Sequence, residues 1–381
     1  MAPGFQGSTV RLARGGVTPG AVAHGLALIA ALVVWGLSGH AQTTARGGNG
    51  TIYAGGYANT IMIIDEATER MVGEIPLRTG MSRSLALSQD RKRFYSLNTM
   101  LEAFETVDIA SRSTLDSFTL SEGNRRVRIR GVAVDPLDRY AIFLIRPVVK
   151  LIDRFEIEPA SLVQVDLGTH AISRTIPWPD DEEQDRVSMV FSPDGEHLYF
   201  MGDDIIVYET RGFTEVDRWE LSAPIEPGLG PISLGSRDDF NEEPGFFTGL
   251  FQMTDPVQGR RMMGVARVNL NERDIDFHTL GPAESIGFTL APDRKTAYGL
   301  FQSVHRYEFW TIDLEQRRVT DRTPFRGRPR MALATSTSGE LLYIYQAGNT
   351  IDLYDAGTKQ YLRTITLDAD LTTDLFVMPA Q

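Results

Sequence analysis

The sequence predicts an all-β protein, a seven-bladed β-propeller whose ring is closed by a C-terminal strand inside the N-terminal blade. Three observations lead to this prediction. A hairpin motif recurs along the chain, a hydrogen-bond acceptor marks the end of one strand in each repeat, and a surplus strand follows the last complete repeat. Repeats of about 40–45 residues with four strands each are typical of propeller blades.

The recurring motif is an apolar strand, a polar turn and a second strand with an aromatic residue. It occurs at residues 85–95, 132–140, 189–199, 288–298 and 333–343. In the copy at 189–199 (MVFSPDGEHLY), Pro-Asp-Gly separates two apolar runs. Pro presets φ, and Gly or Asp tolerates the left-handed conformation of a hairpin turn. We therefore expect each copy to form the first two strands of a blade.

A second strand pair in each repeat contains a marker residue, where a strand ends and a short turn begins. The seven markers are Asp65, Asp108, Asp166, Glu209, Asn269, Asp313 and Asp355. Their successive spacings are 43, 58, 43, 60, 44 and 42 residues, so four match one blade and two contain insertions. Such side chains accept hydrogen bonds from the backbone of their own turn. We interpret the markers as turn residues rather than as metal ligands or catalytic groups.

The order of strands predicts how the ring closes. With strands named a to d outward from the axis, a-strands are expected near residues 83, 130, 187, 231, 285 and 331. Residues 51–77 supply only three strands, whereas 373–378 (TDLFVM) is a spare strand at the other end. Pairing the two would complete the seventh blade and remove exposed sheet edges. A parallel solenoid, the alternative all-β fold, has shorter repeats and lacks hairpin turns.

The first 41 residues are expected to be a secretory signal peptide. Arg11 and Arg14 precede an apolar run from Ala21 to Leu37, and small residues follow up to Ala41. This order is typical of a cleaved export signal. An uncleaved anchor is the alternative, because a run of about 17 residues is close to the shortest membrane-spanning helix. We expect a linker at 42–50, a propeller at 51–381, and a periplasmic protein that is free of the membrane after cleavage.

Composition excludes several classes of function. The chain has 38 basic and 50 acidic residues, a formal net charge of −12. Loss of residues 1–41 removes two arginines and no acid, which lowers the charge to −14. A nucleic-acid binder would need a basic surface instead. The absence of Cys excludes disulfides, thiolate metal sites, covalently attached haem and a Cys nucleophile in this chain. An exported protein without Cys is compatible with the periplasm.

Motifs for catalysis are missing from the sequence. No H-E-x-x-H, G-x-S-x-G, phosphate-binding or dinucleotide-binding motif occurs. His170 and His197 are expected in turns on the face opposite the channel mouth, His278 on an outer strand, and only His305 near the mouth. A hydrolase would need converging carboxylate and His side chains there. We interpret His305 as a loop residue rather than a general base, and expect no cofactor in this chain.

Candidate binding residues lie in the loops of the mouth. Long b-to-c connections are expected at 146–159 and at 255–262, and residues 238–244 are expected to add to the second insertion within the same blade. Long connections often carry function. Loops 123–130 and 322–330 each contain four arginines, whereas 180–185 is acidic. Separate charges of this kind favour a protein partner or a carboxylate ligand, with ordinary solvated loops as the alternative. The candidates are Arg125, Arg126, Arg128, Arg146, Lys150, Asp153, His305, Arg326, Arg328 and Arg330.

The pattern resembles the β subunit of quinohemoprotein amine dehydrogenase. The resemblance is carried by residues 137–176, with an F-E-I-E-P motif inside the long excursion, and by the following MVFSPDGEHLYFMGDDIIVYE. Residues 287–319 and the closing YDAGTKQYLRTITL fit the same pattern. More distantly, the chain is similar to the amine dehydrogenase heavy chain and to YVTN-type propellers. The resemblance covers most of residues 50–380.

The resemblance implies a periplasmic, non-catalytic subunit of an amine-oxidising complex. Its partners would be a dihaem cytochrome-type subunit and a small subunit that bears cysteine tryptophylquinone. The haem c and the quinone would then belong to those partners, and this chain would help to wall the quinone pocket. The alternative is a stand-alone propeller, either a lactonase-like hydrolase or a protein-binding module.

Overall fold

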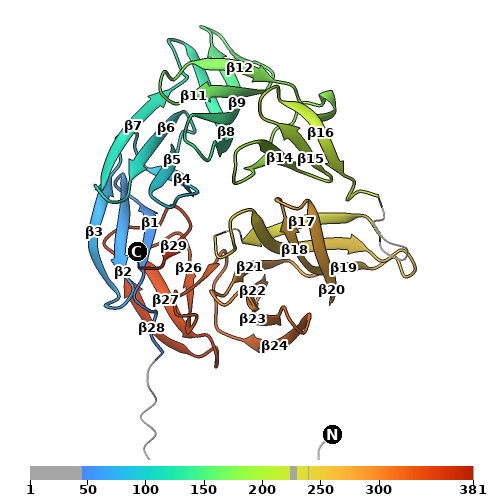
Figure 1. Ribbon diagram of the computed structural model, residues 1–381. Helices are drawn as coiled ribbons and strands as arrows, with labels where there is room; N and C mark the ends of the chain where they lie inside the picture. Colours follow the sequence, from blue (N-terminus) through green and yellow to red (C-terminus); the bar gives the residue numbers. More distant parts are fainter. Residues whose placement is uncertain (1–44, 224–229, 239, 381) are drawn as a thin grey trace, which may run out of the picture. The chain divides into compact units, whose positions relative to one another are not determined.

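The computed structural model describes residues 45–223, 230–238 and 240–380, which form seven antiparallel sheets (Figure 1). Six sheets have four strands and the third has five, so the predicted seven-bladed propeller is confirmed. Within the described ranges the one helical element is a 3₁₀ turn at Pro179–Asp181. No helix in those ranges is long and apolar enough to span a bilayer. The expected signal peptide lies outside the described residues.

The strands of each blade follow one another in the order a to d. The first blade contains β29 (Phe376–Met378), β1 (Thr51–Gly56), β2 (Thr60–Asp65) and β3 (Arg70–Pro76), and the second contains β4 (Ser82–Leu87), β5 (Arg93–Asn98), β6 (Ala103–Asp108) and β7 (Ser113–Thr119). The third contains β8 (Arg125–Val134), β9 (Tyr140–Lys150), β11 (Ser161–Asp166) and β12 (Ile172–Ile176), with β10 (Phe155–Ile157) added beside β9.

The remaining four blades follow the same plan. The fourth contains β13 (Ser188–Phe191), β14 (His197–Met201), β15 (Ile205–Glu209) and β16 (Thr214–Trp219), and the fifth contains β17 (Ile232–Asp238), β18 (Phe246–Thr254), β19 (Arg261–Asn269) and β20 (Asp274–Pro282). The sixth contains β21 (Ile286–Leu290), β22 (Thr296–Ser303), β23 (Arg306–Asp313) and β24 (Arg318–Pro324), and the seventh contains β25 (Ala332–Thr335), β26 (Leu341–Tyr345), β27 (Thr350–Asp355) and β28 (Tyr361–Thr366).

The C-terminal strand closes the ring as the sequence predicted. Strand β29 pairs antiparallel with β1, with Met378 opposite Thr51 and Phe376 opposite Tyr53. The backbone N–H of Thr372 also donates to the carbonyl of Gly55, at 2.8 Å, so the contact continues beyond the strand. The first blade thus takes its innermost strand from one end of the chain and the other three from the opposite end.

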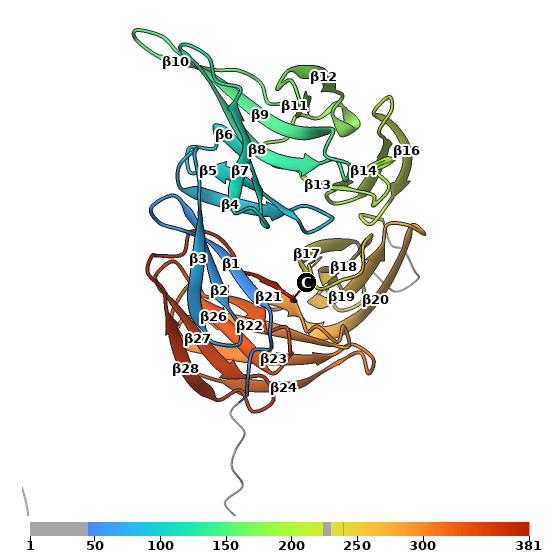
Figure 2. The same cartoon turned by 60° about the vertical axis from the view of Figure 1, so that its left-hand side comes forward.

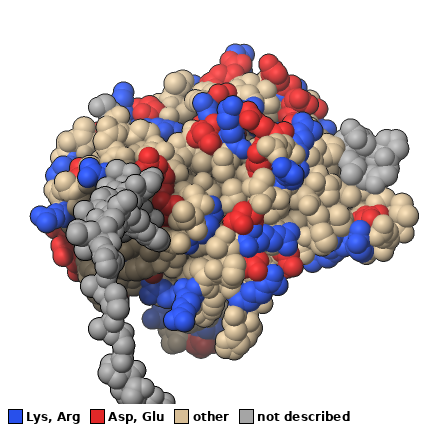
Figure 3. All heavy atoms as spheres, turned by 90° about the horizontal axis from the view of Figure 1, so that it is seen from below, with Lys and Arg blue, Asp and Glu red and all other residues tan. Residues whose placement is uncertain are grey.

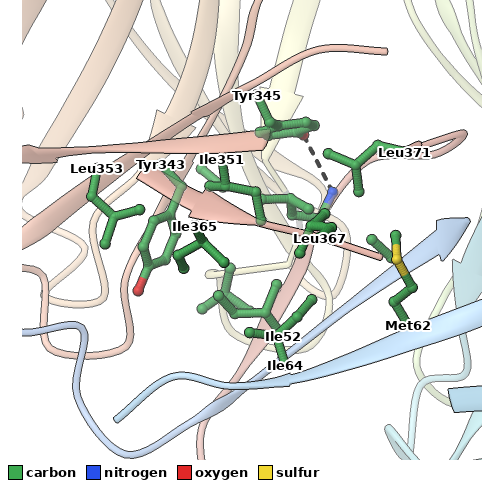
Figure 4. Close-up of a cluster of buried hydrophobic side chains, with 14 of the residues drawn as sticks. Ile52, Met62, Ile64, Tyr343, Tyr345, Ile351, Leu353, Ile365, Leu367 and Leu371 are labelled. Atoms are coloured by element: carbon green, nitrogen blue, oxygen red, sulfur yellow. Dashed lines mark hydrogen bonds between the residues drawn. The ribbon is translucent and has the colours of Figure 1, made fainter. Parts of the chain in front are cut away.

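The core of the propeller lies between the blades. Seven clusters of buried hydrophobic residues occur, and each contains residues from two neighbouring blades. Figure 4 shows the cluster that joins the last blade to the first, where Ile52 and Ile64 face Tyr343 and Leu353. Full burial of one such side chain contributes about 1.5–3 kcal/mol. Packing between neighbouring blades therefore holds the ring together, including the first blade, which packs against the seventh blade on one side and the second blade on the other.

All seven c-to-d turns have the same local structure. The marker side chain accepts a backbone N–H in each of them, for example from Ser111 to Asp108 and from Thr358 to Asp355. The residue four positions after the marker has φ between 53° and 61° in every turn. The interpretation of the markers as turn residues is confirmed.

The fifth blade departs from one prediction. The sequence assigned residues 238–244 to the enlarged b-to-c side, but Asp238 ends β17 and residues 240–245 connect β17 to β18, an a-to-b connection. The extra length is also taken up by β18, β19 and β20, which have nine residues each. The segment therefore lies on the face of the a-to-b and c-to-d turns, which we call the turn face, opposite the mouth face.

Candidate functional site

The third blade carries an extension on the mouth face. Strands β8 and β9 have 10 and 11 residues, and β10 pairs with the end of β9 so that Phe155 lies opposite Lys150 and Ile157 opposite Val148. The side-chain amide of Asn124 donates to the carbonyl of Lys150 and fixes the end of the hairpin. Figure 2 shows β10 standing clear of the other blades. The predicted excursion at 146–159 is thus an ordered β-hairpin.

The register of this extension places the candidate residues on one face. Residues directly opposite each other in antiparallel strands share a face, and faces alternate along each strand. Arg126 lies opposite Val148, Arg128 opposite Arg146, and Phe155 opposite Lys150. One face, which we call the blade-3 face, therefore contains Arg126, Arg128, Arg146, Val148, Lys150, Phe155 and Ile157.

The opposite face of the extension belongs to the core. Val127, Ile129 and Pro147 are buried, and the first two pack in the cluster shared with the second blade. By contrast, Phe155 and Ile157 are 66% and 65% exposed, and Ile152 at the hairpin tip is fully exposed. Aromatic and aliphatic side chains this exposed on an ordered strand are typical of an interaction surface.

Two of the four cations on the blade-3 face are paired within the protein. Arg126 lies 3.7 Å from Glu102, and Arg146 lies 2.9 Å from Asp185 and also contacts Glu183. Arg128 and Lys150 form no ion pair with any residue that the structure describes. The face consequently presents free positive charge beside exposed apolar side chains.

Arg125 lies on the core-facing side and forms a different contact. Its guanidinium donates twice to Glu158, at 2.9 and 3.2 Å. The hydrogen bond from Arg125 lowers the pKa of Glu158 below its ordinary value, and the same bond raises the pKa of Arg125. The pair joins the start of β8 to the end of the hairpin. Asp153 lies in the hairpin turn, where its carboxylate accepts from Arg154 at 3.2 Å.

The basic and acidic loops do not form separate sectors around the third blade. Asp185 contacts both Arg130, at 3.7 Å, and Arg146, at 2.9 Å. The acidic loop 180–185 therefore neutralises part of the neighbouring basic surface. On the side that lies below in Figure 1, away from the third blade, Figure 3 also shows acidic and basic residues interspersed.

The remaining candidates lie on the sixth and seventh blades, which are not neighbours of the third. His305 occupies a tight two-residue turn between β22 and β23 with φ of 63°, and it is exposed. Arg328 donates to the hydroxyl of Thr350 at 3.1 Å and to Asp352 at 3.4 Å. Arg326 is exposed, and Arg330 lines a hollow of about 300 Å³ at the mouth. The structure therefore divides the candidates into two groups.

Other histidines lie where the sequence placed them. His170 is in a c-to-d turn, His197 begins β14 after an a-to-b turn, and His278 lies on the outer strand β20. In the described ranges, no three acidic or His side chains are grouped closely enough to hold a metal ion.

Sequence reasoning missed the apolar half of the site. Phe155 and Ile157 lie in the F-E-I-E-P motif, but their exposure depends on the pairing of β10 with β9. Their alternation with Glu156 and Glu158 was a usable signal, because alternation of this kind predicts a two-sided strand.

Comparisons with known proteins place the chain by fold. The sequence matches no family model and no curated protein. A functionally unknown protein from Desulfotomaculum acetoxidans is similar in structure, with a TM-score of 0.52, 12% identity, and coverage of 87% of this chain and 99% of that one. Dihydro-heme d1 dehydrogenase NirN is similar with a TM-score of 0.51 and 12% sequence identity, and the match covers 86% of this chain and 75% of that one. Hydrazine synthase from Kuenenia stuttgartiensis has a TM-score of 0.47 and 13% sequence identity, and the match covers 88% of this chain and 99% of that one. Likeness at these identities concerns the fold alone.

Proposed function

We propose that this chain is a non-catalytic, exported binding subunit that holds an acidic partner protein against its blade-3 face. The observation that carries the proposal is the combination, on one ordered face, of exposed Phe155 and Ile157 with the unpaired cations Arg128 and Lys150. Aromatic residues and Arg are enriched in protein interfaces.

The net negative charge of the whole protein would confine an acidic partner to a local positive face. A chain with a formal net charge of −12 would repel such a partner over most of its surface. A local positive face therefore directs the encounter to one place and one orientation. A stable complex would bury a standard interface, about 1,600 Å² or more in total.

We further propose a role in a quinohemoprotein amine dehydrogenase-like complex in the periplasm. The blade-3 hairpin is the segment in which the sequence resembles that family most specifically. In such a complex the partners are a dihaem cytochrome-type subunit and a small quinone-bearing subunit. This chain would hold the small subunit and wall the pocket in which primary amines are oxidised, while haem c and quinone belong to the partners.

Affinity purification from the native cells tests the proposal. The tagged chain would be isolated from the periplasmic fraction under mild conditions, followed by an absorption spectrum and by staining of the separated subunits for haem and for quinone. A haem Soret band together with a small quinone-positive subunit is expected. Acidic partners without either chromophore would retain the binding role and overturn the amine dehydrogenase role. A chain that elutes alone would overturn both.

A further inference from the structure

A cavity of about 460 Å³ lies at the turn-face end of the central channel, far along the blades from the mouth-face hairpin. Its wall comes from the innermost strands of several blades and from the start of β18, and it includes half-buried Leu85, Val132, Phe191, Phe246 and Phe376. Pockets of about 300–1,000 Å³ with mainly apolar walls are the usual size and character of small-molecule sites.

The segment 240–245 lies across this end of the channel. The guanidinium of Arg91, from the second blade, donates to the carbonyl of Phe240 at 2.6 Å and stacks over its ring at 4.9 Å. The ring of Phe240 also lies 5.9 Å from that of Phe376 in the first blade. On the other side, Asp238 accepts from the N–H of Phe240 and from Leu290 in the sixth blade, both at 2.9 Å. The connection is thus fastened to blades on both sides of the axis.

The carboxylates of the cavity wall are already paired with arginines, and Arg91, an arginine of the same wall, is held by the carbonyl and the ring of Phe240. Asp135 accepts from Arg139 at 2.8 Å, Asp138 contacts Arg93, and Glu242 accepts from Arg267 at 3.1 Å. Glu243 pairs with Arg294 at 2.6 Å. A charged ligand would have to displace one of these partners, whereas a neutral ligand needs only the apolar wall.

We propose that the turn-face end of the channel is a binding site for a neutral, apolar molecule of one or two aromatic rings. The site is independent of partner binding at the blade-3 face. Leu85 and Val132 supply the aliphatic wall, and Phe191, Phe240 and Phe376 supply rings for contact with an aromatic ligand.

The test uses two fluorescent probes of similar size on the purified exported chain. N-phenyl-1-naphthylamine is neutral, and 8-anilinonaphthalene-1-sulfonate is its anionic counterpart. We expect saturable binding of one neutral probe per chain, with the anion binding at least about tenfold more weakly. Absence of saturable binding, or equal binding of the anion, would overturn the proposal.

Variants locate the bound probe. Ala86 lines the cavity and is exposed, so Ala86→Phe fills the space without entering the core. Val132→Phe adds a ring to the cavity from the third blade, where Val132 is half-buried beside the cluster shared with the second blade, and it serves if Ala86→Phe lowers the melting temperature. Both should weaken binding of the neutral probe at least about tenfold. Ala171→Phe is the matched control in an exposed turn outside the cavity, and it should bind as wild type does. Wild-type affinity in folded Ala86→Phe and Val132→Phe would refute this location.

Discussion

Each c-to-d turn depends on two residues, the marker that accepts hydrogen bonds and the residue four positions later. Five of the seven later residues carry charged side chains, and none is Gly, although all have left-handed φ. A left-handed backbone costs a residue with a Cβ about 1–2 kcal/mol. The marker hydrogen bonds and the fixed strand ends offset this cost in every blade.

Arg112 offers a direct measurement of that cost. It is exposed, with φ of 53°, and follows the marker Asp108. Arg112→Gly should raise the free energy of unfolding by up to about 1 kcal/mol, because Gly adopts this conformation without strain. Arg112→Val should lower it by a similar amount, because a β-branched residue tolerates the conformation least. Urea unfolding of the two variants checks the order, and equal stabilities would contradict it.

His278 predicts a pH dependence of stability. Burial lowers the pKa of His278 below its ordinary value of 6.5, and the nearby Arg317 lowers it further. Below about pH 6.5 the His278 side chain is therefore protonated in the unfolded chain but still neutral in the folded chain. Proton binding then stabilises the unfolded state, so the free energy of unfolding falls as the pH decreases toward the folded pKa. His278→Gln removes this contribution. Urea unfolding at about pH 7.5 and 5.5 should show a larger loss for wild type than for the variant. Parallel losses would show that His278 does not titrate in this way.

At the scale of the element, the blade-3 extension is a two-sided sheet. Its core side anchors it through Val127 and Ile129, and its outer side is free to meet a partner. Because the anchored side is buried, charge changes on the outer side should alter binding without unfolding the blade.

Reversing the free cations tests the electrostatic part of the account. Arg128→Glu with Lys150→Glu should weaken partner binding, mainly by slowing association, and the difference from wild type should shrink as salt is added. The matched control is Arg326→Glu. Arg326 is exposed and belongs to the candidates on the sixth and seventh blades, away from the blade-3 face. Association rates measured by surface plasmon resonance at several salt concentrations provide the readout. An equal effect of the control would argue against a specific role for the blade-3 face.

The sequence predicted local features well, because they depend on near neighbours. Asp355 and its equivalents form turns with residues two to four positions away, so a single repeat contains the whole signal. The ion pairs of Asp185 with Arg130 and Arg146 could not be predicted from the sequence, because only the folded ring brings these three residues together. Phe240 was assigned to the wrong side of the fifth blade for the same reason, since the bounds of β17 and β18 depend on their register.

At the scale of the whole molecule, the ring is closed by a short contact. Strand β29 has only three residues, yet Leu375, Val377 and Met378 are buried between the first blade and its neighbours. Every other join between blades is continuous in the chain, so this one holds the two ends of the protein together.

Removal of residues 372–381 should therefore destabilise the entire ring. Lost burial of the three side chains alone would cost about 5 kcal/mol or more. We expect one cooperative melting transition at a clearly lower temperature, followed by circular dichroism. An unchanged melting temperature for the truncated protein would refute the importance of this closure.

The central claim is that the blade-3 face binds the partner of this propeller. Native mass spectrometry of the complex isolated from the native cells, for wild type and for Phe155→Asp with Ile157→Asp, tests it most directly. The control is Val72→Asp, a change at a 49% exposed residue on the outer strand of the first blade. The account predicts that wild type and the control carry the same additional subunits, whereas the double variant is folded and alone. A folded double variant that retains the full set of partners would contradict the account.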